Sequence, residues 1–463
     1  MKIYNSLTGK KEELIPLDGK EIRMYICGMT VYDDTHIGHA RTFLCFDLIV
    51  KYLRSSGYKV NYIRNITDVD DKIIARAQEL NVDATELTDK YISSMQKDFN
   101  DLGMIVPDLE PRATDNIDSI ISLIEGLIDK GHAYTGKSNV YFSTDSFKEY
   151  GRLSNRNTED LIAGARIEVD EEKKNAADFV LWKQASEGLT WDSPWGSGRP
   201  GWHIECSAMS MDALGNNFDI HGGGIDLKFP HHENEIAQSV CATGEDFVKC
   251  WMHTRPLRID KEKMSKSLDN FITIKEALKE LPSEVIRFFL ISNHYRSPLN
   301  YSEEGVVEAK SSLDRLYTSL IDLDIKKENP SKDVDLISPF IEAMDDDFNV
   351  PSALAALFEI AKSINLAKEN GDVEEATVLG ATLVNLSKPL GILQQNAEDY
   401  FQLGATLSNE EIQSMIAERN KARDDKDFEL SDKIRDLLLE KGIVLEDTDK
   451  GTNWKVQTNW KVQ

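Results

Sequence analysis

The sequence predicts an α/β fold: a Rossmann-like parallel sheet with an insertion, followed by a helical domain and a small C-terminal domain. A strand–helix–strand pattern occupies residues 21–64, and a polar, Trp/Gly/Pro-rich stretch interrupts the chain at about 115–200. Apolar residues keep helical spacing from about residue 311. We therefore expect three domains, at 1–310, 311–400 and 401–463.

The predicted sheet begins with residues 21–28, whose alternating apolar side chains are typical of a strand. Residues 39–56 carry apolar side chains at helical spacing, and Gly57 suits the end of a helix. Residues 59–64 predict the next strand. Because such units join parallel strands, we expect a parallel sheet, whose second half follows the insertion from about Trp202 to Asp260.

The C-terminal third is predicted to be mainly helical. Residues 351–358 show the helical spacing of the second domain, and residues 410–445 predict two more helices followed by a short strand at 442–445. The chain ends on a repeat, because residues 452–457 recur as residues 458–463. We assign this repeat no function.

The composition is that of a globular protein with several cores, since 41% of the 463 residues are hydrophobic and 29% are charged. No apolar run approaches the roughly 20 residues that a membrane helix needs, and the N-terminus lacks the apolar core of a signal peptide. We expect a cytoplasmic protein with no membrane association. Five cysteines in a chain of this length argue against a disulfide framework.

The net charge of −26 argues against promiscuous binding of nucleic acid, which usually needs a basic surface. It is compatible with a local basic path on an acidic protein. On composition alone, the sequence favours an enzyme that acts on small molecules.

Residues 35–41, Thr-His-Ile-Gly-His-Ala-Arg, place His36 and His39 three apart where a loop enters the predicted helix. Helix N-termini carry unpaired N–H groups and bind phosphates readily. Gly38 lets a nucleotide approach the backbone, and both imidazoles can donate hydrogen bonds as charge develops on a phosphate. The alternative is a loop with two surface histidines.

Residues 263–267, Lys-Met-Ser-Lys-Ser, follow a probable strand end at 257–260. We expect Lys263 and Lys266 to lie in a mobile loop. Lysine is a flexible point charge, so these two side chains are suited to neutralising a departing pyrophosphate. The alternative is a solvated basic loop.

A third set of residues predicts a metal site. His231 and Glu235 are four apart, which puts both on one face of a helix that Pro230 is suited to start. With Cys27 and Cys206 they offer two thiolates, one imidazole and one carboxylate, which is a plausible zinc shell. Spacing alone leaves open that the cysteines are buried in a core. The three other cysteines are expected to be structural: Cys45, Cys241 and Cys250.

The histidine and lysine motifs, in this order and roughly 225 residues apart, resemble the paired signatures of the class I aminoacyl-tRNA synthetases. Together with the four metal-ligand candidates, they resemble the cysteine-specific members of that family over nearly the whole chain. The resemblance implies catalytic roles for His36, His39, Lys263 and Lys266. It implies that ATP, with Mg²⁺, is bound by His36, Gly38, His39 and Lys266. It implies one Zn²⁺ per chain on Cys27, Cys206, His231 and Glu235.

The resemblance also implies that Thr67 and Trp202 line a cysteine pocket, although core packing is an equal alternative for Trp202. The implied reaction activates L-cysteine with ATP and transfers it to the 3′ end of tRNA(Cys). A soft metal would separate cysteine from serine, which an apolar pocket does only weakly. The helical and C-terminal domains would contact the anticodon arm, and we expect a monomer.

Several alternatives stay open at this point. The basic residues of 419–441 alternate with acidic ones, as in a solvated helix. The glycine run after His221 is more typical of a simple turn than of a nucleotide contact. A related ligase that joins cysteine to an amino sugar would share the same zinc and ATP sites. A catalytically inactive, tRNA-binding paralogue belongs to a different class of function.

Overall fold

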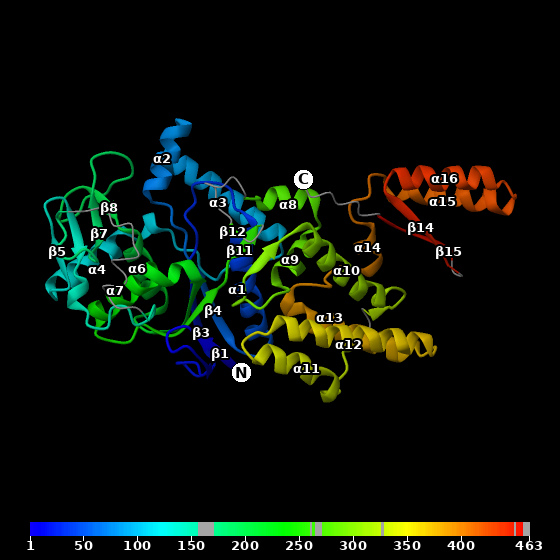
Figure 1. The fold of residues 1–463 in the computed structure, drawn as a ribbon, viewed down its shortest axis with the longest axis horizontal. Helices are drawn as coiled ribbons and strands as arrows, with labels where there is room; N and C mark the ends of the chain where they lie inside the picture. The colour runs from blue at the N-terminus through cyan, green and yellow to red at the C-terminus, as the bar shows by residue number, and fades with distance from the viewer. Residues whose placement is uncertain (156–170, 260–261, 264–270, 326–327, 449–450, 457–463) are drawn as a thin grey trace. The chain divides into compact units, whose positions relative to one another are not determined.

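The computed structural model describes residues 1–155, 171–259, 262–263, 271–325, 328–448 and 451–456 (Figure 1). The chain divides into two compact units, each interrupted in sequence. The first unit comprises Met1–Lys275, Leu290–Asn300 and Ile341–Ala353. The second comprises Glu276–Phe289, Tyr301–Phe340 and Leu354–Gln463.

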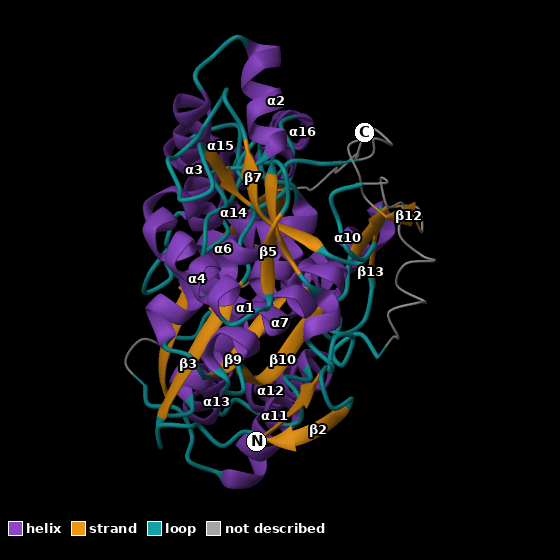
Figure 2. Ribbon diagram, turned by 90° about the vertical axis from the view of Figure 1, so that its left-hand side faces the viewer, coloured by secondary structure: helices purple, strands orange, loops and turns teal. Residues whose placement is uncertain are grey.

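The first unit is built on a four-stranded parallel sheet in the order β10-β9-β3-β4. Figure 2 shows β3, β9 and β10 running side by side. The order places the strands from both halves of the sequence next to one another, because β3 pairs with β4 on one side and with β9 on the other. The strands are β3 (Glu21–Ile26), β4 (Lys59–Arg64), β9 (Phe218–Gly224) and β10 (Val248–Thr254).

Helix α1 (Ile37–Ser55) connects β3 to β4, so the predicted strand–helix–strand unit is confirmed. The helix begins two residues earlier than expected, because His36 has an extended backbone and caps it. It ends before Gly57, whose φ of +90° is a conformation that glycine adopts without strain.

The insertion between the two halves folds around its own antiparallel sheet, in the order β5-β6-β7-β8. Helix α4 (Ile117–Asp129) precedes this sheet, and Trp182 is fully buried in the core that they share. The strands are β5 (Ala133–Thr135), β6 (Asn139–Phe142), β7 (Phe179–Gln184) and β8 (Gly198–Pro200).

The remaining elements of the first unit are helices and short strands outside the parallel sheet. Helices α2 (Asp71–Leu80) and α3 (Ala84–Asp101) follow β4, and helices α6 (Trp202–Leu214) and α7 (Glu233–Thr243) flank β9. The N-terminal strands β1 (Lys2–Asn5) and β2 (Lys10–Glu13) pair with each other. A smaller sheet has the order β12-β11-β13, from β12 (Glu262–Lys263), β11 (Leu257–Ile259) and β13 (Leu299–Tyr301).

The second unit is mainly helical, as the sequence predicts. It contains all of α10 (Glu303–Leu320), α13 (Val373–Ser387) and α14 (Ala397–Gln402). It also contains most of four helices whose remaining residues belong to the first unit: α8 (Ile274–Glu280), α9 (Ser283–Ile291), α11 (Val334–Asp345) and α12 (Val350–Glu369). The C-terminal helices α15 (Asn409–Asp424) and α16 (Phe428–Glu440) precede a hairpin of β14 (Ile443–Thr448) and β15 (Gly451–Val456). This hairpin adds a partner to the predicted short strand, and the second copy of the terminal repeat lies outside the described residues.

Among the described residues, one helix, α12, is long and apolar enough to cross a membrane by length and composition alone. That is weak evidence, because core helices of ordinary globular proteins pass the same test. The buried residues Leu357, Ile360, Ala361 and Ile364 recur at helical spacing, so one face of α12 is covered within the protein.

Candidate active site

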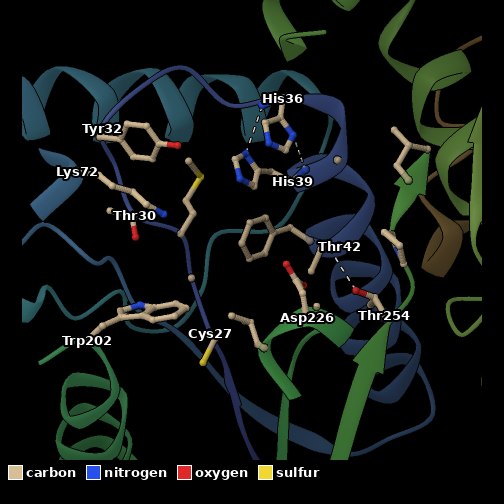
Figure 3. Close-up of a pocket in the computed structure, with 18 residues that line it drawn as sticks. Cys27, Thr30, Tyr32, His36, His39, Thr42, Lys72, Trp202, Asp226 and Thr254 are labelled. Carbon is tan, nitrogen blue, oxygen red and sulfur yellow. Dashed lines mark hydrogen bonds between the residues drawn. The ribbon is translucent and has the colours of Figure 1, made fainter. Parts of the chain in front are cut away.

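A cavity of about 330 Å³ opens at the carboxyl ends of the central parallel strands. Cys27 and Gly28 follow β3, Gly224 ends β9, and Thr254 ends β10, and all four line the cavity. Ligands of open parallel sheets bind at this edge, where the loops after the strands converge. Figure 3 shows His36 and His39 on one side of the cavity and Trp202 and Cys27 on the other.

Gly28 is required for the close approach of two strand ends. A Cβ atom at this position would lie 1.7 Å from the backbone oxygen of Asn65, far inside van der Waals contact. The Gly28 N–H instead donates to Oδ1 of Asn65 at 2.8 Å. The floor of the cavity therefore depends on a glycine directly after Cys27.

The two histidines of the first motif cap the helix that they begin. The His39 N–H donates to Nδ1 of His36 at 3.2 Å, and the His36 N–H donates to Nδ1 of His39 at 3.4 Å. Their rings stack with centroids 3.6 Å apart. Because each Nδ1 accepts a hydrogen bond, a neutral ring carries its proton on Nε2 and is a donor there. Both residues, with Gly38, line the cavity.

The four predicted metal ligands meet at one point of the first unit. The Sγ atoms of Cys27 and Cys206 are 3.7 Å apart, and Sγ of Cys27 is 3.5 Å from Oε1 of Glu235. Nε2 of His231 lies 3.1 Å from the same oxygen. The four donor atoms lie within 4.8 Å of one another, and all four residues are buried. Cys27 directly follows β3, Cys206 lies in the second turn of α6, His231 lies in the turn before α7, and Glu235 lies in the first turn of α7.

The donor set fits a divalent, thiophilic cation such as zinc. Burial and the neighbouring Cys206 raise the pKa of the Cys27 thiol well above its ordinary value. The hydrogen bond from Cys27 lowers the pKa of Cys206, but burial and Glu235 outweigh it and raise that pKa overall. Burial lowers the pKa of His231, which keeps its imidazole neutral. A bound cation would favour the thiolate forms of the two cysteines and would balance their charge and that of the carboxylate.

The turn that carries His231 directly precedes the helix that carries Glu235. Helix α7 begins at Glu233, and His231 lies in the preceding turn η4 (Lys228–His232), which is interrupted at Phe229 by an extended backbone (φ −143°, ψ 133°). Helical backbone resumes after Phe229, at Pro230, which agrees with the predicted position of this proline. The spacing of four still brings His231 and Glu235 together, because η4 continues into α7.

Histidines that the sequence did not single out surround the four donors. Nδ1 of His203 lies 2.9 Å from Nδ1 of His231, and Nε2 of His221 lies 2.8 Å from Oε2 of Glu235. Nδ1 of His232 lies 2.9 Å from Nε2 of His253. Cys27, Glu235, His221 and His232 also form a second cluster of donor atoms within 4.8 Å. The only sequence signal for these residues is their presence beside the candidate ligands and the glycine run.

Trp202 and Thr67 occupy different positions relative to the cavity. Trp202 lines it, is 39% exposed, and stacks on His231 with ring centroids 4.2 Å apart, so it is not a core residue. Thr67 is buried, and its backbone pairs with that of Thr30, which lines the cavity. The assignment of both residues to a substrate pocket stays a prediction.

The glycine run after His221 forms the end of strand β9 rather than a turn. A Cβ atom at Gly222 would lie 2.5 Å from the ring of Phe46 on α1, so glycine allows this helix to lie close to the sheet. Gly224, at the strand end, lines the cavity.

The lysine motif is described only at its first residue. Lys263 belongs to β12, where it pairs with Arg258 of β11, and Lys266 lies outside the described residues. The roles of both lysines therefore stay predictions.

Comparison with known proteins identifies the class to which this fold and site belong. A family described as "tRNA synthetases class I (C) catalytic domain" matches residues 13–311, and a DALR domain matches residues 339–394. Methionyl-tRNA synthetase of Mycobacterium tuberculosis, in complex with methionyl-adenylate, has a TM-score of 0.63 at 16% identity over 84% of this chain and 95% of that chain. LeuRS of Agrobacterium radiobacter K84 has a TM-score of 0.59 at 12% identity over 83% of this chain and 85% of that chain. The fold is that of the class I aminoacyl-tRNA synthetases, as predicted.

Closer relatives narrow the class to one family. The cysteine–tRNA ligase of Marinobacter nauticus is 53% identical over 459 residues, covering 98% of this chain and 99% of the relative. That of Shewanella sediminis is 54% identical over 458 residues, with the same coverage. The chain belongs to the cysteine–tRNA ligase family, which confirms the resemblance seen in the sequence motifs.

Proposed function

We propose that this chain activates L-cysteine with ATP and transfers the cysteinyl group to the 3′ end of tRNA(Cys). One observation carries the proposal beyond family membership. The four-donor cluster of Cys27, Cys206, His231 and Glu235 reaches, through Cys27, the cavity that the two histidines of the first motif also line. This shared cavity supports a proposal in which the cluster selects a thiol and the start of α1 binds phosphate.

Cys27, Cys206, His231 and Glu235 would hold one Zn²⁺ per chain. When bound, the zinc offers a soft position that a substrate thiolate fills far better than a serine hydroxyl. Glu235 is fixed on its other oxygen by His221, and His231 is oriented by His203, so the chain's own residues hold both ligands in place. Two residues would bound the cysteine pocket: Trp202, which stacks on His231, and Thr67, whose backbone pairs with that of Thr30.

His36, Gly38 and His39 would bind ATP at the start of α1, where the Nε2 donors and helix N–H groups suit phosphate oxygens. The carboxylate of cysteine attacks the α-phosphorus, the bond to the β-phosphate oxygen breaks, and pyrophosphate leaves with Mg²⁺. Lys263 and Lys266 would neutralise the charge that develops on this leaving group. A ribose hydroxyl of the terminal adenosine then attacks the cysteinyl carbonyl, and AMP leaves. Positioning and charge stabilisation supply the catalysis.

The proposal also assigns a separate role to each of the three domains. Residues 1–310 would carry the chemistry, 311–400 would bind tRNA, and 401–463 would contact the anticodon end. With a net charge of −26, the chain would bind RNA through local clusters of Lys and Arg. We propose a cytoplasmic monomer.

Cysteine-dependent exchange of pyrophosphate with ATP tests the first step. We expect exchange with cysteine and little with serine, followed by charging of tRNA(Cys). Exchange without tRNA charging, combined with transfer of cysteine to an amino sugar, would favour the related ligase. Absence of exchange in a folded, zinc-loaded protein would contradict the proposal.

A further inference from the structure

The segment that leaves the lysine motif pairs with the segment that enters the histidine motif. His36 and Thr273 form an antiparallel bridge. The Ile37 N–H donates to the Ile272 oxygen at 3.0 Å, and the Ile274 N–H donates to the Thr35 oxygen at 2.9 Å. All of these residues belong to the first unit. The two motifs, far apart in sequence, are therefore linked by backbone pairing at their edges.

Asp34 and Lys275 form an ion pair beside this bridge. Asp34 lies two residues before His36, and Lys275 is the second residue of α8, which begins directly after Thr273. Nζ of Lys275 is 2.6 Å from Oδ1 of Asp34. The ion pair therefore joins the loop that enters α1 to the first turn of α8, next to the isolated backbone bridge.

Helix α3 holds the aspartate side of this pair. Ser94 donates to Oδ1 of Asp34 at 2.9 Å, and Thr35 donates to the carboxylate of Asp98, one helical turn further along α3. Burial alone would raise the pKa of Asp34, but the hydrogen bonds from Lys275 and Ser94 outweigh it and lower that pKa. Asp34 is thus a fixed anion close in sequence to His36, the N-cap of α1. The side chain of Lys275 forms its ion pair with this anion.

We propose that Asp34 and Lys275 are positioning residues that hold the segment after the lysine motif against the start of α1. Loss of the ion pair would let residues 271–275 shift relative to His36. Errors of about 1 Å in positioning can lower a catalysed rate on the order of a hundredfold. This inference rests on the proposed function, because it assumes that both motifs act on one ATP.

The geometry separates a positioning role from a purely structural one. Lys275 and Asp34 are 43% and 33% exposed in their side chains, and ion pairs this exposed contribute little to stability. Their loss should therefore leave the fold intact while it changes the alignment of the motifs. Neither residue is among those that line the cavity at the histidine motif.

The test is a double-mutant cycle with Asp34→Asn, Lys275→Met and the double variant, measured by cysteine-dependent ATP–pyrophosphate exchange. We expect each single variant to lower kcat roughly fivefold or more, with unchanged KM for cysteine and unchanged zinc content, and the double variant to be no worse than the singles. The charge-reversed variant Asp34→Lys with Lys275→Asp should recover part of the rate. Lys11→Met serves as the control, because Lys11 of β2 forms a comparably exposed ion pair with Asp346 at 2.6 Å and belongs to neither motif.

Hydrogen exchange of the Ile37 and Ile274 amides gives a second readout that needs no activity. Both amides should lose protection in each single variant and keep it in Lys11→Met. Normal kcat and normal protection in both single variants would overturn the proposal. So would a slow Lys275→Met beside a normal Asp34→Asn, since Lys275 would then act alone. An inactive wild-type protein with the expected loss of protection would instead count against the proposed function.

Discussion

Nδ1 of His203 lies 2.9 Å from Nδ1 of His231, while Nε2 of His231 faces Glu235 at 3.1 Å. His231 is buried and His203 is half-buried; desolvation lowers the pKa of His203 to about 4, so its imidazole is neutral. A hydrogen bond on one ring nitrogen fixes the tautomer and orientation of the other, which is how ligating histidines are commonly held. His203 is therefore placed to orient the candidate metal ligand His231.

This relationship predicts that His203→Phe keeps the four donors but leaves His231 without its orienting partner. We expect metal affinity to fall by about 10- to 100-fold, as for other residues that orient ligands. Competition with a chromogenic chelator measures the affinity. The reference variant is His294→Phe, because His294 lies outside the donor cluster. Equal chelator resistance in wild type and His203→Phe would contradict the assignment.

Loss of one thiol ligand should affect the metal and the substrate together. Cys206→Ser is expected to lose zinc on dialysis and to lose cysteine-dependent pyrophosphate exchange in parallel, because a hydroxyl is a poor ligand for a soft metal. Metal analysis and exchange assays on the same preparations test this. Cys241→Ser is the matched control, since Cys241 is also buried but belongs to neither donor cluster. An active protein that contains no zinc would contradict the zinc hypothesis.

The glycine after Cys27 should be intolerant of any side chain. In Gly28→Ala, the added Cβ would meet the Asn65 backbone oxygen at 1.7 Å, so the strand end must shift. We expect a loss of about 1–3 kcal/mol in stability and reduced metal affinity, because Cys27 would move with it. Gly126→Ala in α4, with nothing within 4 Å of its Cβ, should instead stabilise by about 0.5–1 kcal/mol. Thermal denaturation of the two variants tests the contrast, and a Gly28→Ala variant as stable as Gly126→Ala would refute it.

The individual helices and strands of this fold could be predicted from sequence, while the residues that hold the side chains of the candidate site in place could not. Strand β4 coincides with its predicted range, because apolar periodicity is a local property. The start of α1 was placed at His39 rather than Ile37, because histidine is not a usual N-cap and its reciprocal capping with His39 depends on side-chain geometry. The insertion is predicted only as an interruption of the sheet, without its strands, since strands of three residues such as β5 and β8 carry little periodicity.

The candidate metal site could likewise be predicted only in part, because its ligands have a sequence signal and its orienting residues do not. Residue types and the spacing of His231 and Glu235 suggest ligands, but their meeting with Cys27 and Cys206 depends on α6 packing against both α7 and β3. His203 and His221 could not be assigned from sequence, because each contacts its ligand through the packing of a different element. A histidine's role as an orienting residue is set by tertiary contacts that no local pattern records.

Lys266 lies outside the described residues, and its proposed role leads to a kinetic prediction. Lys266→Ala should lower the single-turnover rate of adenylate formation more than it weakens ATP binding, because the lysine acts on charge that develops in the transition state. A loss of about 2–4 kcal/mol in transition-state stabilisation is expected, as for removal of one preorganised electrostatic partner. Rapid-quench measurements separate rate from affinity. A collapse of ATP affinity at an unchanged rate would assign Lys266 to ground-state binding.

The C-terminal helices and hairpin have a core of their own, which leads to a prediction about tRNA. Residues of α15, α16, β14 and β15 form this separate apolar cluster: Ile412, Ile416, Ile434, Leu438, Ile443 and Trp454. Deletion from Gly404 onward, after α14, removes that cluster as a whole. The truncated protein should therefore retain cysteine-dependent pyrophosphate exchange, because every described residue of the candidate site lies before residue 264.

Charging of tRNA should respond differently to the same deletion. We expect KM for tRNA(Cys) to rise and the salt dependence of binding to weaken, because each lost Lys or Arg contact to phosphate lowers the slope of affinity against salt by about one. Steady-state charging at several salt concentrations measures both quantities. The deleted segment is itself rich in acidic residues, so lost contacts rather than lost net charge must account for weaker binding. Equal loss of exchange and charging in a folded truncation would show that this segment supports the catalytic unit instead of recognising RNA.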